Sequence, residues 1–365
     1  NALVERAIAS ADAMLPRAGR PPNVPAVCPP RERDGAFEFD NGSLRARVTS
    51  GGEIVELSAD GIPSAIERGN RLALYRDRPA KWEAWNVDAD YVRFPEPLRM
   101  RTPRIADGGL AIPFDAGTDS RGTLRLSIAE GEPFLRVDAA IDWRSRRRLL
   151  RVENDLRVDA GEVTYGAPHG VVVRSAAADS PARRAQYEVP GQRFAAAWDR
   201  STGNGVVSFA LDTYGWNGRA PEPGRLRLGH SLLRGTTWPD PHADAGEHQL
   251  AWAYAPVRAG GGIGSLERDW LRFACEPSVR LFETGDDAVL IAACKPAEDG
   301  DGVVLRVREC DGAARRLRIR CGGRMREVRA VDALERPLAG DAAIEAESIA
   351  ASIGAFALRS FRVRF

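Results

Sequence analysis

From residue 35 to the C-terminus, apolar and polar residues alternate with a period of two, and this feature most constrains the fold. The stretch AFEFDNGSLRARVTS (36–50) alternates on both sides of an Asn41-Gly42 turn signal, and TLRLSIAEGEPFLRVDAAIDW (123–143) alternates around its EGEP turn. A period of two places one face of each strand in a core and the other in water. Many such strands, with almost no helical period, predict an all-β chain built around a large antiparallel β-sandwich.

The pattern divides the chain into three regions. Residues 1–34 begin with helical spacing of apolar residues and continue with six prolines, which predicts a short N-terminal helix and an extended linker. Residues 35–273 carry the large sandwich. A fresh series of hairpins fills residues 274–365, where short strands predict a small immunoglobulin-like β-sandwich.

The amino-acid composition limits the classes of binding partner that we expect for the chain. The 365 residues are 44% hydrophobic with a net charge of +1, which is typical of a globular protein and predicts neither a nucleic-acid nor a membrane partner. Five scattered cysteines without a CxxC pair predict reduced thiols, no cysteine zinc site and a cytoplasmic location. The first residue is Asn, which suggests a fragment of a longer protein.

The stretch SLLRGTTWPDPHADAGEH (231–248) concentrates carboxylates, histidines, one Arg and one Trp. Two interpretations are open. A metal site would use Asp240, His242, Asp244 and His248, but the prolines keep the chain extended and no pair has helical i, i+4 spacing, so no metal site is expected. In a sugar site, Arg234 and Asp240 would bond hydroxyls and Trp238 would stack on a pyranose face.

The stretch LYRDRPAKWEAWNVDADYV (74–92) has a similar composition. Asp77, Trp85 and Asp88 belong to an alternation of acidic and aromatic residues that is typical of carbohydrate sites. The alternative is that the tryptophans are buried in the sandwich and the acids cap turns. The run RLRLGHSLLR (225–234) also interrupts its alternation at Leu232 and Leu233, which predicts a β-bulge that re-aims Arg234.

Nucleophile, nucleotide and zinc-protease motifs such as GxSxG, a P-loop and HExxH are absent from the sequence, and no catalytic residue is predicted within it. Sequence alone does not select a pair of carboxyls at the separation that glycoside hydrolysis needs.

Five segments, in this order, resemble the C-terminal region of the family 38 glycoside hydrolases, the α-mannosidases. They are LYRDRPAKWEAWNVDADY, VTYGAPHGVVVRSA, YEVPGQRFAAAW, LRLGHSLLRGTTWPDPHADAGEHQLAWAYAP and CKPAEDGDGVVLRVRE. Together they span roughly residues 36 to 365. The chain departs from the family pattern at Ser175, Ala176 and Phe194, which leaves open whether the parent protein is active.

The resemblance implies a fragment of an α-mannosidase whose zinc ligands and aspartate nucleophile lie in a preceding catalytic domain. No zinc or other cofactor is then expected in this fragment. The sandwich would pack against that domain and supply a second wall to its α-mannoside site, with Arg234 as the residue that reaches it. The alternative is a stand-alone carbohydrate-binding or scaffold protein with a galactose-mutarotase-like sandwich. Assembly into a homo-oligomer stays open in both cases.

Overall fold

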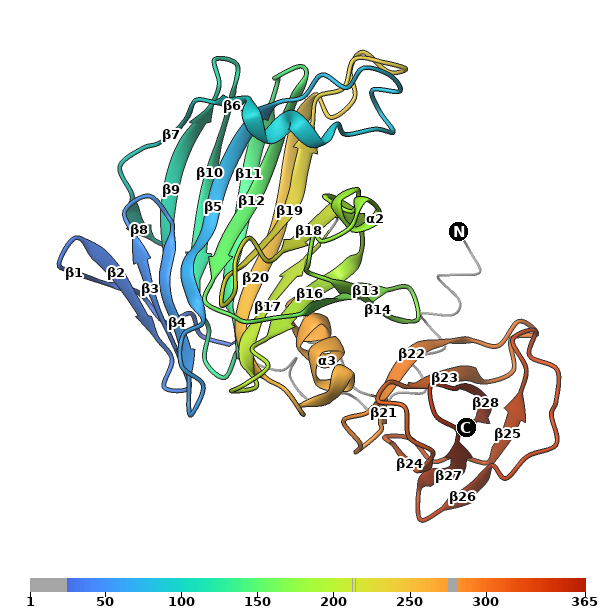
Figure 1. Ribbon diagram of the computed structural model, residues 1–365. Helices are drawn as coiled ribbons and strands as arrows, with labels where there is room; N and C mark the ends of the chain where they lie inside the picture. Colours follow the sequence, from blue (N-terminus) through green and yellow to red (C-terminus); the bar gives the residue numbers. More distant parts are fainter. Residues whose placement is uncertain (1–24, 212, 214, 275–280) are drawn as a thin grey trace. The chain divides into compact units, whose positions relative to one another are not determined.

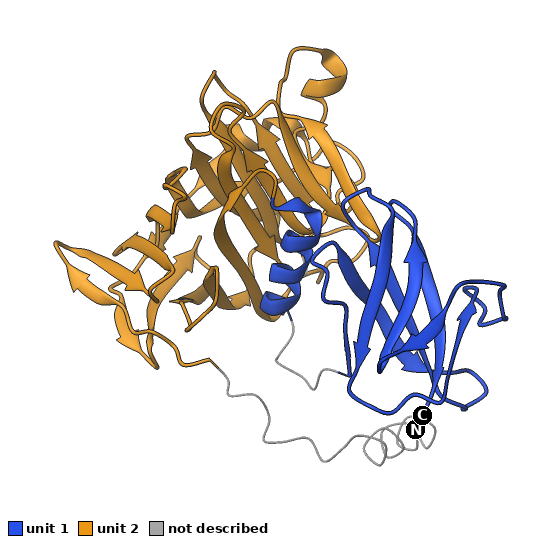
Figure 2. Cartoon of the chain, turned by 90° about the horizontal axis from the view of Figure 1, so that it is seen from below, with its two compact units in different colours: residues 1–24, 261–365 blue, residues 25–260 orange. Residues whose placement is uncertain are grey.

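The computed structural model describes residues 25–211, 213, 215–274 and 281–365. The helix predicted at the start of the chain lies outside the described residues. The described chain forms two compact units, which we call the large domain (Pro25–Gly260) and the small domain (Gly261–Phe365) (Figure 2). The helix α3 (Gly262–Ala274) belongs to the small domain. The domain bounds inferred from the sequence remain a prediction.

The large domain consists of two ten-stranded antiparallel sheets (Figure 1). The first sheet has the order β1 (Arg31–Arg33), β2 (Ala36–Asp40), β3 (Leu44–Thr49), β4 (Ile54–Ala59), β5 (Ile66–Arg76), β12 (Arg148–Leu156), β19 (Leu226–Arg234), β18 (Gly215–Arg219) and β15 (Val189–Pro190), with β6 (Pro95–Glu96) beside β5. The second has the order β14 (Gly170–Ser175), β13 (Glu162–Ala167), β16 (Gln192–Trp198), β17 (Asn204–Ala210), β20 (Gly246–Arg258), β11 (Leu135–Trp143), β10 (Ser120–Ser127), β9 (Gly109–Ala116) and β7 (Leu98–Met100), with β8 (Arg104–Ala106) beside β9.

The alternation read from the sequence builds the core between these sheets. In β11, every second residue from Leu135 to Trp143 is buried and joins one hydrophobic cluster with residues of the first sheet. The Asn41-Gly42 turn connects β2 to β3, with Gly42 at φ +90°, a conformation that favours glycine. The prediction of a large antiparallel sandwich is therefore confirmed.

The small domain is a second sandwich with its own core. One sheet has the order β21 (Phe282–Glu283), β24 (Arg315–Cys321), β27 (Ser348–Ile353) and β26 (Ala343–Glu345). The other has the order β22 (Val289–Pro296), β23 (Val303–Glu309), β28 (Leu358–Arg364) and β25 (Glu327–Val331). Leu305, Ile319, Ile349 and Phe361 are fully buried between them, and this small sandwich also agrees with the prediction.

Helices are few in the described part of the chain. Besides α3, they are the short helix α2 (Pro181–Arg184) and the 3-10 helix η1 (Ala89–Arg93). None of the helices among the described residues is long and apolar enough to cross a membrane.

Candidate functional site

The topology of the first sheet brings two segments that are distant in sequence together at one end of its central strands. β5 and β19 both pair antiparallel with β12, so they run in the same direction and end side by side. Leu149 of β12 pairs with Tyr75 of β5 on one side and with Arg234 of β19 on the other. Two loops follow the ends of β5 and β19, and we call them the aromatic loop (77–94) and the proline loop (235–245).

The predicted bulge is present in β19 and decides where Arg234 points. Leu150 pairs with Leu233 and Arg151 with Ser231, which leaves Leu232 as the extra residue. Leu232 and Leu233 both pack against the core. Strict alternation from Ser231 would have turned Arg234 inward, whereas the extra residue returns it to the outer face of the sheet.

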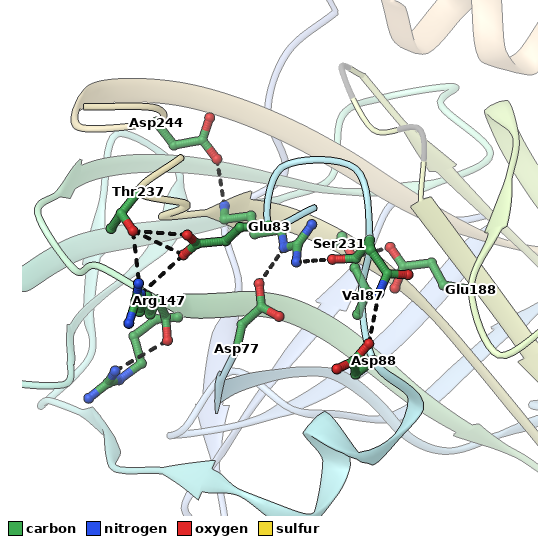
Figure 3. Close-up of polar contacts among 12 residues, drawn as sticks. Asp77, Glu83, Val87, Asp88, Arg147, Glu188, Ser231, Thr237 and Asp244 are labelled. Carbon is green, nitrogen blue, oxygen red and sulfur yellow. Dashed lines mark hydrogen bonds and ion pairs between the residues drawn. The ribbon is translucent and has the colours of Figure 1, made fainter. Parts of the chain in front are cut away.

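Arg234 holds both loops. Its guanidinium forms an ion pair with Asp77 through Nε and donates from Nη2 to the carbonyl oxygen of Asn86, both in the aromatic loop. Its backbone N–H donates to the carboxylate of Asp244 in the proline loop at 2.6 Å (Figure 3). The Asp77 side chain is only 2% exposed, and burial raises its pKa although Arg234 opposes that change.

Three tryptophans on the same two loops form an exposed cluster. Trp82 and Trp85 belong to the aromatic loop and Trp238 to the proline loop, with ring centroids 5.4 to 6.5 Å apart. These residues are 62%, 69% and 49% exposed, respectively. The interpretation that buries the tryptophans of the aromatic loop in the sandwich is therefore wrong. Both loops lie beyond the ends of the strands (Figure 1), so the two sheets of the large domain do not enclose the rings.

A smaller polar cluster ties the two loops together beside the tryptophans. The Thr237 hydroxyl donates to the carboxylate of Glu83 at 2.9 Å, and Arg147 donates to the same carboxylate at 3.3 Å (Figure 3). These contacts fix the backbone that carries Trp82 and Trp238. Trp82 itself has φ +59°, in the left-handed region that a bulky residue rarely adopts.

Two predicted site residues serve local turns. Asp88 accepts hydrogen bonds from the backbone of Ala80 at 2.9 Å and from the side chain of Asn86 at 2.7 Å, so it shapes the aromatic loop. Asp240 is exposed and accepts from the backbone of His242 at 2.8 Å. The structure thus gathers Asp77, Trp85, Arg234 and Trp238 in one place, while Asp88 and Asp240 lie in the same loops with their carboxylates engaged in turns.

A buried polar network lies under the aromatic loop, and the sequence did not single it out. The Arg151 guanidinium, with a fully buried side chain, forms an ion pair with Glu188 and donates to the Ser231 hydroxyl at 2.6 Å and to Asn217 at 3.1 Å. It also lies 5.5 Å from the ring centre of Tyr91, whose pKa burial raises to about 12. Alternation along β12 puts Arg151 on the outer face, but only the covering loop explains its burial.

A second part of this network lies on the same face. Tyr75 donates its hydroxyl to Glu153 at 2.6 Å, and Arg71 donates to the other oxygen of that carboxylate at 2.7 Å. Buried charges of this kind are tolerated because each has a partner. The network therefore packs against the aromatic loop through Tyr91, whose ring lies 5.1 Å from that of Tyr75.

The site offers stacking surfaces and hydroxyl partners, but it does not fit a zinc ion. Among residues 25–211, 213, 215–274 and 281–365, no three His, Cys, Asp or Glu side chains are placed to hold a metal ion. The ring of His248 instead contacts the carbonyl oxygen of Asp244 at 2.7 Å.

Comparison with known proteins gives consistent matches. The model of the glycosyl hydrolases family 38 C-terminal domain matches residues 39–242, and that of the family 38 C-terminal beta sandwich domain matches residues 288–361. Alpha-mannosidase 2C1 of Homo sapiens is 26% identical over 333 residues, which cover 84% of this chain and 31% of that protein. Alpha-mannosidase G of Dictyostelium discoideum is 24% identical over 312 residues, covering 78% of this chain and 28% of the relative.

A solved structure shares the fold. The crystal structure of an alpha-mannosidase from Enterococcus faecalis V583 superposes with a TM-score of 0.67 at 12% identity, over 89% of this chain and 42% of that one. The chain therefore spans less than a third of the length of the two curated relatives, and less than half of the solved structure.

Proposed function

Since the chain belongs to glycosyl hydrolase family 38 and forms its C-terminal region, we propose that the large domain supplies one wall of an α-mannoside site. The zinc ligands and the nucleophile would come from a part of the functional protein outside these 365 residues. The relatives that the chain matches are named alpha-mannosidases, and they are more than three times as long as the matched region.

The observation that carries this proposal is the exposed tryptophan cluster. Three large aromatic rings together in water forfeit the burial that would otherwise stabilise them, and such patches mark interaction sites. The apolar face of a pyranose stacks on an indole, and neighbouring carboxylates accept hydrogen bonds from sugar hydroxyls. Trp85 and Trp238 would stack with the sugar. Glu83, whose side chain is 12% exposed, holds Thr237 and Arg147 and so fixes the loops that carry the rings.

Arg234 has a different role in this proposal from that of the tryptophans. Its guanidinium is already bound to Asp77 and to the carbonyl oxygen of Asn86, and its side chain is 16% exposed. We therefore assign Arg234 as a positioning residue: it holds the aromatic loop, and through that loop the rings of Trp82 and Trp85, at a fixed distance from the proline loop.

The test uses the longest reading frame that contains this chain, next to the 365-residue chain itself. In the long protein, Trp85→Ala with Trp238→Ala should lower kcat/KM for an aryl α-mannoside at least tenfold, a loss of about 1.4 kcal/mol of transition-state stabilisation. The melting temperature should change little because the rings are exposed. The matched control is Phe356→Ala, an aromatic residue of the small domain that is 71% exposed.

Assays of the 365-residue chain by itself distinguish the proposed wall of an α-mannoside site from a stand-alone carbohydrate-binding protein. We expect the 365-residue chain to show no hydrolysis of an aryl α-mannoside with added zinc. Hydrolysis above that of a mock purification would contradict the wall role. A stand-alone carbohydrate-binding protein would instead bind methyl α-mannoside as the 365-residue chain. It would lose that binding when Trp85 and Trp238 are replaced by Ala, and its function would not depend on a longer reading frame.

A further inference from the structure

The small domain carries a groove on the outer face of the sheet β21-β24-β27-β26. Its volume is about 660 Å³, within the range of small-molecule sites. The floor is β24, one side is the turn after β21, and the other is the β26-β27 hairpin. The groove is lined by Glu283, Thr284, Gly285, Asp286, Arg316, Leu317, Arg318, Arg320, Ala346 and Ser348.

Three arginines follow one another along the floor. Arg316, Arg318 and Arg320 occupy alternate positions of β24, and all three are exposed. The residues between them, Leu317 and Ile319, are buried in the core. Because alternate residues of a strand share a face and lie about 7 Å apart, the three guanidiniums form a row that opens into the groove.

This row is largely unneutralised. Arg320 lies 3.6 Å from Glu283, but both side chains are more than half exposed, so water and salt weaken that pair. Within the described residues, no acidic side chain pairs with Arg316 or Arg318. The neighbouring Arg315 shows the contrast, since its guanidinium contacts the buried Glu309 at 3.1 Å. Like charges along one strand face repel one another, and the fold gains nothing from leaving them unpaired.

The other residues of the groove narrow the class of ligand. None of the described residues that line it is aromatic, so they offer no surface on which nucleic-acid bases stack. Glu283 and Asp286 stand at one edge, where they would repel a continuous polyanion but accept hydrogen bonds from hydroxyl groups. The Ser348 hydroxyl comes from the strand position that pairs with Arg320.

We propose that this groove binds an anionic sugar, with Arg316 and Arg318 on its phosphate or carboxylate group. Guanidinium forks match both anions in bidentate geometry. The carboxylates at the edge receive the hydroxyls of the sugar ring. The site lies wholly within the small domain and is independent of the function proposed for the large domain.

Calorimetric titration of the 365-residue chain tests the proposal with four probes: glucose 6-phosphate, glucuronate, glucose and inorganic phosphate. We expect the two anionic sugars to bind more tightly than inorganic phosphate, and glucose not to bind. Affinity should fall as salt rises. The double variant Arg316→Ser/Arg318→Ser should weaken binding of the anionic sugars at least tenfold.

The control is Arg324→Ser/Arg326→Ser, which removes two exposed arginines of the same domain that do not line the groove. This variant should bind as the parent does. Equal affinity for glucose 6-phosphate and inorganic phosphate would refute the sugar part of the proposal. No binding of any anion, or equal losses in both double variants, would refute the site itself.

Discussion

Replacing Arg234 by Leu should destabilise the large domain and should do so in a pH-dependent way. The substitution removes the guanidinium that pairs with Asp77 and leaves a carboxylate that is 2% exposed without its charged partner. Breaking a buried pair from one side costs about 3–5 kcal/mol. For a domain of this size, about 3 kcal/mol lowers the melting temperature by roughly 6–12 °C.

The pH dependence follows from the direction of the Asp77 pKa. Burial already raises this pKa while Arg234 opposes the change, so removing the arginine raises it further. A carboxyl whose folded pKa lies above its unfolded value binds more protons when folded. The folded state is then favoured at low pH, and this contribution is lost as pH rises through the folded pKa. The gap between parent and variant should therefore be larger at pH 8 than at pH 5.

Thermal unfolding of the 365-residue chain, followed by near-ultraviolet circular dichroism at both pH values, measures this gap. The double variant Arg234→Leu/Asp77→Leu should recover at least half of the loss, because it also removes the buried charge. Arg45→Leu is the matched control, because Arg45 and Asp40 form an ion pair at 3.3 Å in which both side chains are more than half exposed. A loss below 1 °C at pH 8, or the same loss at both pH values, would refute the reasoning.

Two further predictions concern the core of the large domain. His230 is fully buried between Trp216 and Trp252, and burial lowers its pKa to about 3. The folded state should therefore lose about 1.4 kcal/mol of stability per pH unit as the pH falls below the unfolded pKa of 6.5. The melting temperature of the His230→Phe variant should fall less steeply over the same pH range. Gly205→Ala should cost about 2–3 kcal/mol because the added Cβ would lie 2.0 Å from a backbone oxygen of β16, whereas Gly170→Ala, which meets open space, should melt as the parent does.

The sequence was sufficient for the class of fold. Alternation with a period of two decides which residues are buried before any tertiary contact is known, and the Asn41-Gly42 signal placed a real hairpin. The interrupted alternation at Leu232 and Leu233 located the bulge in β19. All three are local properties, because they depend only on the pleat of one strand or one pair of strands.

The composition of the site was visible in the sequence, but its assembly was not. Asp77 and Arg234 stood out as separate candidates 157 residues apart, and only the order β5-β12-β19 makes them partners. Burial on an outer sheet face depends on which loop lies over it, so no local pattern indicated that Arg151 is enclosed. The exposure of Trp82 and Trp85 was undecided for the same reason. Local patterns determine which way a side chain faces, whereas the surroundings it meets there are decided by segments far away in the chain.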